Sequence, residues 1–213
     1  MNVIKTKTYN VLGDKKMKEQ MLKFIKENDR SIKVFIFLFI LGLATGVICF
    51  KYINIASNNE FINSFNNTLE IVKKEDFLKI SIFTNAIINI LVTYSFIVIS
   101  SITIIAPFIL FIIYFLKGFS IGILINILLT IFGFNQGLLL ILLMVIIPNI
   151  LSLSTLIFLG IKTIDFNYFI LEKHDLKKII KQSIVYSMYF VLSSPIMLLS
   201  VFIEQLTLPL LIS

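Results

Sequence analysis

The sequence contains few of the side chains that build catalytic or metal-binding sites. It has one cysteine, Cys49, one histidine, His174, and no tryptophan. A lone cysteine cannot form an intramolecular disulfide, and the two side chains do not give the ligand spacing of a metal site. The sequence also lacks an HExxH motif, a GxSxG motif and a phosphate-binding glycine loop. We therefore expect no enzymatic activity, no bound metal and no cofactor.

Charge is scarce over the longest part of the chain. Residues Ile80 to Ile161 form an 82-residue stretch in which Lys117 is the one charged side chain. One helical crossing of a bilayer needs about 20 apolar residues, so this stretch predicts several membrane spans in series. The chain has 213 residues, of which 58% are hydrophobic. The sequence therefore predicts an integral membrane protein that contacts the lipid bilayer and has no separate soluble domain.

The basic residues predict which segments face the cytoplasm. The first 33 residues hold nine Lys or Arg and four acids, and residues 162–181 hold five Lys and three acids. Residues 51–79 hold four Lys and four acids. Because cytoplasmic segments are enriched in Lys and Arg, we expect the first two segments inside and the third outside. The lysines flank apolar runs, so the net charge of +7 does not indicate nucleic-acid binding.

This charge pattern requires an odd number of crossings between residues 80 and 161, and three fit the length. We therefore predict an all-α, polytopic membrane protein with five transmembrane helices and a cytoplasmic N-terminus. The alternative is six spans, which would place residues 162–181 outside. The predicted turn between the second and third spans is marked only by Pro107 and by the Ser-Ser-Ile-Thr cluster at 100–103. The predicted spans are 32–52, 80–101, 104–131, 138–161 and 182–204.

The same pattern divides the chain into three parts. Residues 1–33 form a basic cytoplasmic segment in which Asp14–Asp29 has amphipathic helical spacing. We expect this helix to lie on the membrane surface, and the alternative is that it binds a partner. Residues 34–204 form the membrane domain, with an external loop 53–79 and a cytoplasmic loop 162–181. Residues 205–213 form a short external tail.

Small residues at helical spacing predict where two spans approach closely. Gly42 and Gly46 form a GxxxG motif in the first span, and Gly118 and Gly122 form a second in the third span. Such pairs let two helix backbones touch. Packing within one chain is the leading interpretation, and a contact between copies in a homo-oligomer is the alternative.

Polar side chains inside the predicted spans indicate interhelical hydrogen bonds or functional sites. Lys117 has no obvious acidic partner in the spans, so it either snorkels to the interface from a tilted or broken helix, or lines a functional groove or a partner contact. Asn85 and Asn89 share one helix face, and we expect them and Asn126 to hydrogen-bond between helices. A solute or ion site is the alternative for the asparagines.

Prolines interrupt two of the predicted spans. Pro148 predicts a kink in the fourth span, where Asn149 or Ser152 can satisfy the carbonyl freed one turn earlier. A functional notch is the alternative interpretation of this position. Pro195, which follows two serines, has the same effect on the fifth span.

The external loop carries a candidate surface for binding a partner. Phe61, Phe65 and Leu69 have partly helical spacing within an Asn-rich segment of balanced charge. An amphipathic segment of this kind rests on a membrane or on another protein. We therefore predict a partner-docking site in this loop, outside the membrane.

A set of short motifs in the membrane domain resembles the stage II sporulation protein M family. The block Pro107–Gly122 ends in Lys-Gly-Phe-Ser-Ile-Gly, and Gly-Phe-Asn-Gln-Gly follows at 133–137. Ile-Ile-Pro-Asn-Ile stands at 146–150, and Phe158–Gly160 completes the set. The order and spacing of these motifs within a five-span chain carry the resemblance. The wider family often has a His and a Glu in the fourth span, so this chain resembles the branch found in endospore formers.

The resemblance implies a function in sporulation. It implies a non-catalytic membrane anchor and scaffold in the bacterial cell membrane, located at the sporulation septum. Such a scaffold recruits an amidase/endopeptidase and a lytic transglycosylase on the external side, where they thin the septal peptidoglycan for engulfment of the forespore. The alternative hypothesis is a small transporter or permease subunit that uses Lys117, Asn126 and Asn149 as a solute path.

Overall fold

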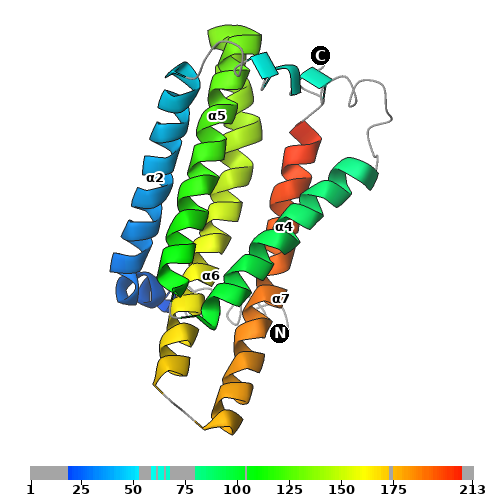
Figure 1. Ribbon diagram of the computed structural model, residues 1–213. Helices are drawn as coiled ribbons and strands as arrows, with labels where there is room; N and C mark the ends of the chain where they lie inside the picture. The colour runs from blue at the N-terminus through cyan, green and yellow to red at the C-terminus, as the bar shows by residue number, and fades with distance from the viewer. Residues whose placement is uncertain are drawn as a thin grey trace, which may run out of the picture.

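The computed structural model describes residues 19–52, 59–60, 62–64, 66–67, 80–103, 105–172 and 175–207. Within these ranges the chain is helical apart from short turns, and no strand occurs there. The predicted all-α class is therefore confirmed (Figure 1). The named helices are α2 (Asp29–Tyr52), α4 (Ile80–Ser101), α5 (Ala106–Leu140), the π-helix η1 (Ile141–Ile146), α6 (Ile147–Leu171) and α7 (Leu176–Thr207).

Three helical runs among the described residues are long and apolar enough to cross a bilayer. They are Asp29–Tyr52, Ala106–Leu171 and Leu176–Glu204, and a shorter apolar helix covers Ile87–Ser101. Large hydrophobic side chains stand exposed along these helices, such as Phe37 on α2 and Val191 on α7. Apolar surface of this extent marks contact with a membrane. The protein is therefore a membrane protein whose outward-facing side chains meet lipid.

The 66-residue run Ala106–Leu171 folds back on itself at Gly133. Gly133 has φ 72° and ψ 179°, which interrupts the helix there. The Tyr114 hydroxyl donates a 2.6 Å hydrogen bond to the Leu156 carbonyl oxygen, 42 residues along the chain. In a straight helix these residues would lie about 60 Å apart. The run is therefore a helical hairpin, with residues 106–132 as its first limb and 134–171 as its second (Figure 1).

The turn that connects α4 to α5 lies where the sequence places it. Helix α4 ends at Ser101, and α5 begins at Ala106 with Pro107 in its first turn, where a missing N–H costs no hydrogen bond. The side-chain amide of Asn167 on α6 donates to the carbonyl oxygens of Ser101, at 2.9 Å, and Thr103, at 2.8 Å. One side chain of α6 thus bonds to two carbonyls at the turn after α4, of which that of Thr103 also accepts from the Ala106 N–H.

The segment 162–181, predicted as a loop, is largely helical. Helix α6 continues to Leu171 and α7 begins at Leu176, so only a short link separates them. Backbone hydrogen bonds within a helix are local, so a helix can extend past the end of an apolar stretch into polar sequence. Hydropathy located the edges of the apolar sequence at residues 161 and 182. Helix α6 extends past the first edge to Leu171, and α7 begins before the second, at Leu176.

The segment 53–79, predicted as an external loop, and the predicted tail are largely outside the described residues. The structure describes short helical pieces at 59–60, 62–64 and 66–67. The candidate docking residues Phe61, Phe65 and Leu69 lie outside the described residues, as do residues 208–213. The docking site in this loop therefore stays a prediction.

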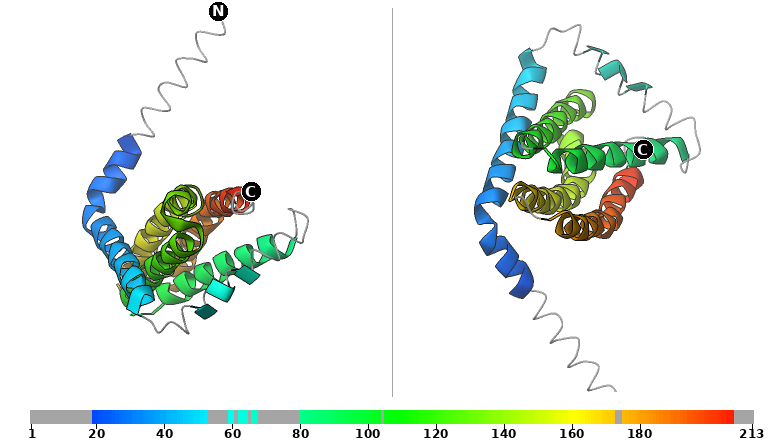
Figure 2. Two further views of the ribbon diagram at one scale, coloured as in Figure 1. Left: turned by 90° about the horizontal axis from the view of Figure 1, so that it is seen from above. Right: turned by 60° about the horizontal axis from the view of Figure 1, so that its bottom comes forward.

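The helices pack around two clusters of buried apolar side chains. One cluster lies between α2, α4, α5, α6 and α7, and the other fills the hairpin near its tip. Helix α4 crosses the bundle obliquely, and the described N-terminal helix at 19–27 leaves the bundle at an angle to α2 (Figure 2). The hairpin-tip cluster comprises Ile121, Leu128, Leu140, Ile141, Met144 and Val145.

Candidate functional site

The two GxxxG motifs pack directly against each other, in the contact between α2 and α5. A Cβ added to Gly42 would overlap the Phe115 carbonyl, and one added to Gly46 would overlap the Phe119 carbonyl. In the other direction, a Cβ on Gly118 would lie 2.9 Å from the Leu43 nitrogen. Only glycine permits backbones to approach this closely. The contact lies within one chain and joins the first apolar helix to the hairpin.

This glycine contact fixes the depth of Lys117 in the helix bundle. Gly118 packs against the backbone of Phe39 and Leu43, on either side of Gly42. Gly42 lies midway along α2 between Lys33 and Lys51, about 13.5 Å from each at 1.5 Å per residue. Lys117 therefore sits at mid-depth, farther from either charged boundary than its side chain can reach. This geometry favours a groove or a partner contact over snorkelling, which was the other interpretation from the sequence.

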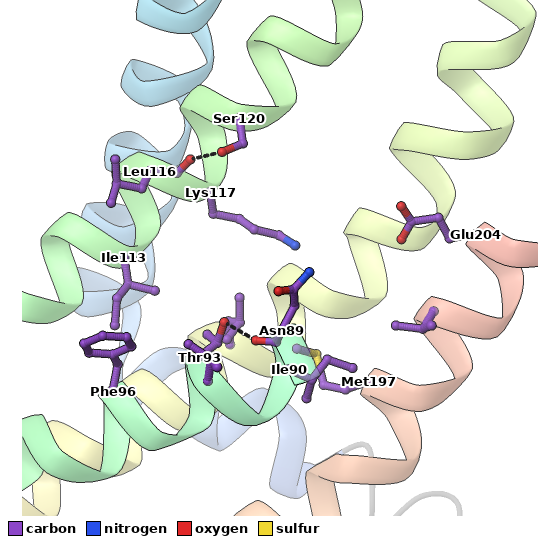
Figure 3. Close-up of a pocket in the computed structure, with 13 residues that line it drawn as sticks. Asn89, Ile90, Thr93, Phe96, Ile113, Leu116, Lys117, Ser120, Met197 and Glu204 are labelled. Atoms are coloured by element: carbon purple, nitrogen blue, oxygen red, sulfur yellow. Dashed lines mark hydrogen bonds between the residues drawn. The ribbon is translucent and has the colours of Figure 1, made fainter. Parts of the chain in front are cut away.

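Lys117 lines a groove between α4, α5 and α7. The groove has a volume of about 510 Å³. Asn89 and Thr93 enter it from α4, Ser120 enters from α5, and Glu204 enters from the last turns of α7. Figure 3 shows the Lys117 side chain extended into the groove toward Asn89, with Glu204 facing it from the far side. Polar groups from three helices thus converge on one mid-depth space that is otherwise lined by apolar side chains.

Glu204 is the acidic partner that the sequence analysis did not find. Its carboxylate faces the groove that Lys117 also lines (Figure 3). The sequence placed Glu204 at the outer end of the last predicted span, and nothing in its spacing related it to Lys117. The obliquely crossing α4 and the long α7 bring the two charges into one space. Opposite charges in a low-dielectric medium attract strongly, which lowers the cost of keeping both there.

The predicted polar residues do not gather at one site. Asn89 lines the Lys117 groove, and its backbone carbonyl accepts a 2.9 Å hydrogen bond from the Thr93 hydroxyl. The Asn126 amide donates at 3.1 Å to the Val47 carbonyl of α2, beside the glycine contact. The Asn149 amide donates at 2.8 Å to the Val145 carbonyl within its own helix. Asn85 lies on α4, and its side chain is outside the described residues.

The proline in the second limb of the hairpin follows a π-helix. Residues Ile141–Ile146 form η1, in which the Ile147 N–H bonds to the Leu142 carbonyl. Pro148 comes next and is buried, and its carbonyl accepts a 2.7 Å hydrogen bond from the Ser200 hydroxyl of α7. Short π-helices and prolines both interrupt the regular ladder of a helix. Here the hydrogen bond from Ser200 joins the interrupted part of the hairpin to α7.

The proline in α7 is compensated locally. Pro195 cannot donate to the carbonyl of Val191, one turn earlier. The Ser194 hydroxyl donates to that carbonyl at 2.8 Å. The neighbouring Ser193 contacts the Tyr94 hydroxyl of α4 at 3.0 Å, which ties α7 to α4 at the same level.

The N-terminal helix at residues 19–27 touches the bundle through one aromatic side chain. The Phe24 ring lies 5.6 Å from the Phe158 ring of α6, and the Lys162 ammonium lies 5.3 Å from the Phe24 centroid. Met21, Leu22 and Ile25 share the same apolar face and are exposed. The helix therefore presents an open apolar stripe at the end of the bundle where α2 begins.

Tyrosines tie the helices together, and the sequence analysis did not single them out. Tyr114 stacks on Phe35 of α2, with ring centroids 4.3 Å apart, and bonds to Leu156 of α6. The hydroxyl of Tyr186 on α7 meets the Thr163 hydroxyl of α6 at 3.0 Å. A tyrosine in an apolar run looks like any other aromatic residue in the sequence, and only the partner oxygen reveals its role.

Most of α2 and almost all of α4 to α7 lie within one family match, whereas the helix at 19–27 lies outside it. The family model described as Stage II sporulation protein M matches residues 35–206.

The chain belongs to the stage II sporulation protein M family.

The resemblance found in the motifs is thereby confirmed. Comparison with curated proteins and with solved structures finds no match. The glycine contact, the hairpin and the Lys117 groove all lie in the part of the chain that this stage II sporulation protein M match covers. The protein is therefore a sporulation-related membrane protein.

Proposed function

We propose that this protein is a non-catalytic membrane scaffold that recruits peptidoglycan-degrading enzymes to the sporulation septum. The family match over residues 35–206 is the observation that carries the proposal. The recruited enzymes are an amidase/endopeptidase and a lytic transglycosylase on the external side. Their action thins the septal wall and allows engulfment of the forespore.

The proposed topology has five crossings, with the N-terminus in the cytoplasm. The hairpin at Gly133 supports it, because the longest apolar run then supplies two crossings and α2, α4 and α7 supply one each. The tip of the hairpin and the C-terminal end of α7 lie toward one end of the bundle (Figure 1). The turn after α4 and the link after α6 lie toward the other end, which is the basic one.

The packing of the bundle suits a scaffold. Backbone contact through four glycines joins α2 to α5, and hydrogen bonds of Tyr94, Tyr114 and Tyr186 join the remaining helices. Close packing and interhelical hydrogen bonds are the main forces that hold membrane helices together. A bundle fixed in this way would keep its external segments in a constant position for partners.

A small transporter is the second candidate, and the Lys117 groove is the observation that favours it. A transporter needs polar groups that line one path at mid-depth. Of the three residues proposed for such a path, Lys117 lines the groove, whereas Asn126 and Asn149 bond elsewhere. The separation of these three side chains weakens the transport hypothesis relative to the scaffold.

Recruitment in sporulating cells tests the scaffold directly. A fluorescent fusion of the amidase/endopeptidase is imaged in cells that lack this protein and in cells that carry the wild-type copy. We expect a focus at the septum only where the wild-type protein is present. A second strain carries Gly118→Leu, which disrupts the glycine contact, and its matched control carries Ala44→Leu on the exposed face of α2. Septal foci in cells without the protein would contradict the proposal.

A further inference from the structure

The Lys117 groove presents opposite charges on two walls and a space between them. Lys117 belongs to α5 and Glu204 to α7, and their side chains face the same groove (Figure 3). Asn89 adds an amide on the wall formed by α4. The groove is thus close to neutral overall, with a hydrogen-bond donor on one side and an acceptor on the other. Such groups are costly inside a membrane unless other polar groups or water meet them.

We propose that this groove is a docking site for the transmembrane helix of a partner that carries a carboxamide, an Asn or Gln side chain, at mid-depth. The carboxamide oxygen accepts a hydrogen bond from the Lys117 ammonium, and its NH₂ group donates to the Glu204 carboxylate. A neutral guest of this kind adds no third charge to the groove. The inference rests on the proposed scaffold function, because it describes how a recruited partner is held.

The depth and openness of the groove favour a helix over other guests. Lys117 lies next to Gly118, which packs beside Gly42, and Gly42 is about 13.5 Å along α2 from Lys33 and from Lys51, which is too deep for a lipid headgroup. Phe96 of α4 and Leu116 of α5 flank the groove and are 58% and 52% exposed. The groove therefore opens sideways, toward the lipid. A helix that diffuses in the bilayer can enter by that route, with its apolar side chains against the flanks and one polar side chain inside.

The length of the walls agrees with this guest. Apart from Leu156 of α6, the lining residues span two turns on each of three helices, from Asn89 to Phe96, Ile113 to Ser120 and Met197 to Glu204. Two turns of a helix extend about 11 Å, which matches one polar side chain and its apolar neighbours at i−4 and i+4. An interhelical hydrogen bond of this type contributes about 1–2 kcal/mol in a membrane, so we expect an effect of about tenfold on association.

Designed peptides in vesicles test the proposal without knowledge of the natural partner. The peptide is a Lys-flanked, 20-residue poly-Leu helix with a dansyl group, and it carries Gln at its centre, Gln near one end, or no Gln. The chain has no tryptophan, so Phe96→Trp gives a single fluorescent reporter at the groove. Quenching of this tryptophan is measured against the peptide-to-lipid ratio. Phe37→Trp, on the exposed face of α2, reports random encounters.

The central-Gln peptide is expected to associate about ten times more tightly than the other two peptides. Lys117→Met should remove this preference. The double variant Lys117→Met with Glu204→Gln removes both charges from the groove and should have the same effect. Ser120→Phe should also remove it, because the ring fills the groove and leaves both charges in place. Lys51→Met, at the end of α2, is the matched control and should keep the preference.

Equal association of the three peptides with the wild-type protein would overturn the proposal. A preference that survives in both Lys117 variants would do the same. Displacement of the central-Gln peptide by free glutamine in the buffer would assign the groove to a soluble solute, and displacement by unlabelled protein would assign it to a second copy. Because no sporulating cell is involved, failure here leaves the septal recruitment result unaffected, and each result can be interpreted separately.

Discussion

The Tyr114 hydroxyl donates a 2.6 Å hydrogen bond to the Leu156 carbonyl, and this bond joins the two limbs of the hairpin that contains the longest apolar run. Tyr114 is 1% exposed, and its ring lies against Phe35 of α2. A Cβ added to Gly160 would overlap the Tyr114 hydroxyl, so the glycine leaves the space that the phenol occupies. Three helices therefore meet at this one side chain.

Replacement of Tyr114 by Phe is expected to destabilise the bundle by about 1 kcal/mol. The change removes the hydroxyl and leaves the ring stack on Phe35, so the loss corresponds to one buried hydrogen bond. The free energy of unfolding in mixed micelles measures it. Tyr168→Phe, where the side chain is 62% exposed, is the matched control and should change stability by far less. Equal effects of the two changes would show that the bond to Leu156 contributes nothing.

Replacement of Gly118 by Leu is expected to destabilise the protein by about 2 kcal/mol or more. The new side chain has no space, because even a Cβ would overlap the backbone of α2 at Phe39. Helices α2 and α5 would have to move apart, and the Asn126 bond to Val47 would lengthen with them. Protein level in the membrane and unfolding free energy measure the effect. Ala44→Leu, on the exposed face of α2, should be tolerated.

The conformation of Gly133 predicts a specific pattern of substitution. With φ 72° and ψ 179°, this residue lies in a region that is essentially restricted to glycine, and not in the left-handed helical region that asparagine also adopts. Gly133→Ala and Gly133→Asn should therefore both destabilise the hairpin, by about 1–3 kcal/mol. No atom from outside the adjacent backbone lies within 4 Å of a Cβ added there, so the cost comes from the backbone conformation. Full stability of the Asn variant would contradict this conformation.

The sequence predicted the helices better than the relations between them. Apolar run lengths and the Ser100–Thr103 turn located α4 and the start of α5 to within two residues, because hydropathy and proline placement act locally. The glycine pairs predicted positions of close helix contact. Their spacing did not indicate that the two pairs lie against each other between α2 and α5. The position of Lys117 and Glu204 in one groove was missed, since it depends on how α4, α5 and α7 pack. The extension of α6 past Lys162 was missed because polar sequence can remain helical.

Cysteine labelling is expected to report the proposed five crossings. The one native cysteine, Cys49, is first replaced by Ser, and single cysteines are then placed at Lys23, Asn135 and Asp175. The cysteine of the Asn135→Cys variant, at the exposed tip of the hairpin, should react with a membrane-impermeant maleimide in intact cells. The cysteines of the Lys23→Cys and Asp175→Cys variants should react only after the membrane is permeabilised. Labelling of the Asp175→Cys variant in intact cells would support six crossings instead.

The most direct test of the scaffold is deletion of this protein in a spore-forming host, with forespore engulfment followed by membrane-dye microscopy. We predict that engulfment stops with flat or bulged septa in the deletion strain. The wild-type copy and the Ala44→Leu copy should both restore it, and the Gly118→Leu copy should not. Normal engulfment and normal spore yield in the deletion strain would contradict the scaffold function proposed for this chain.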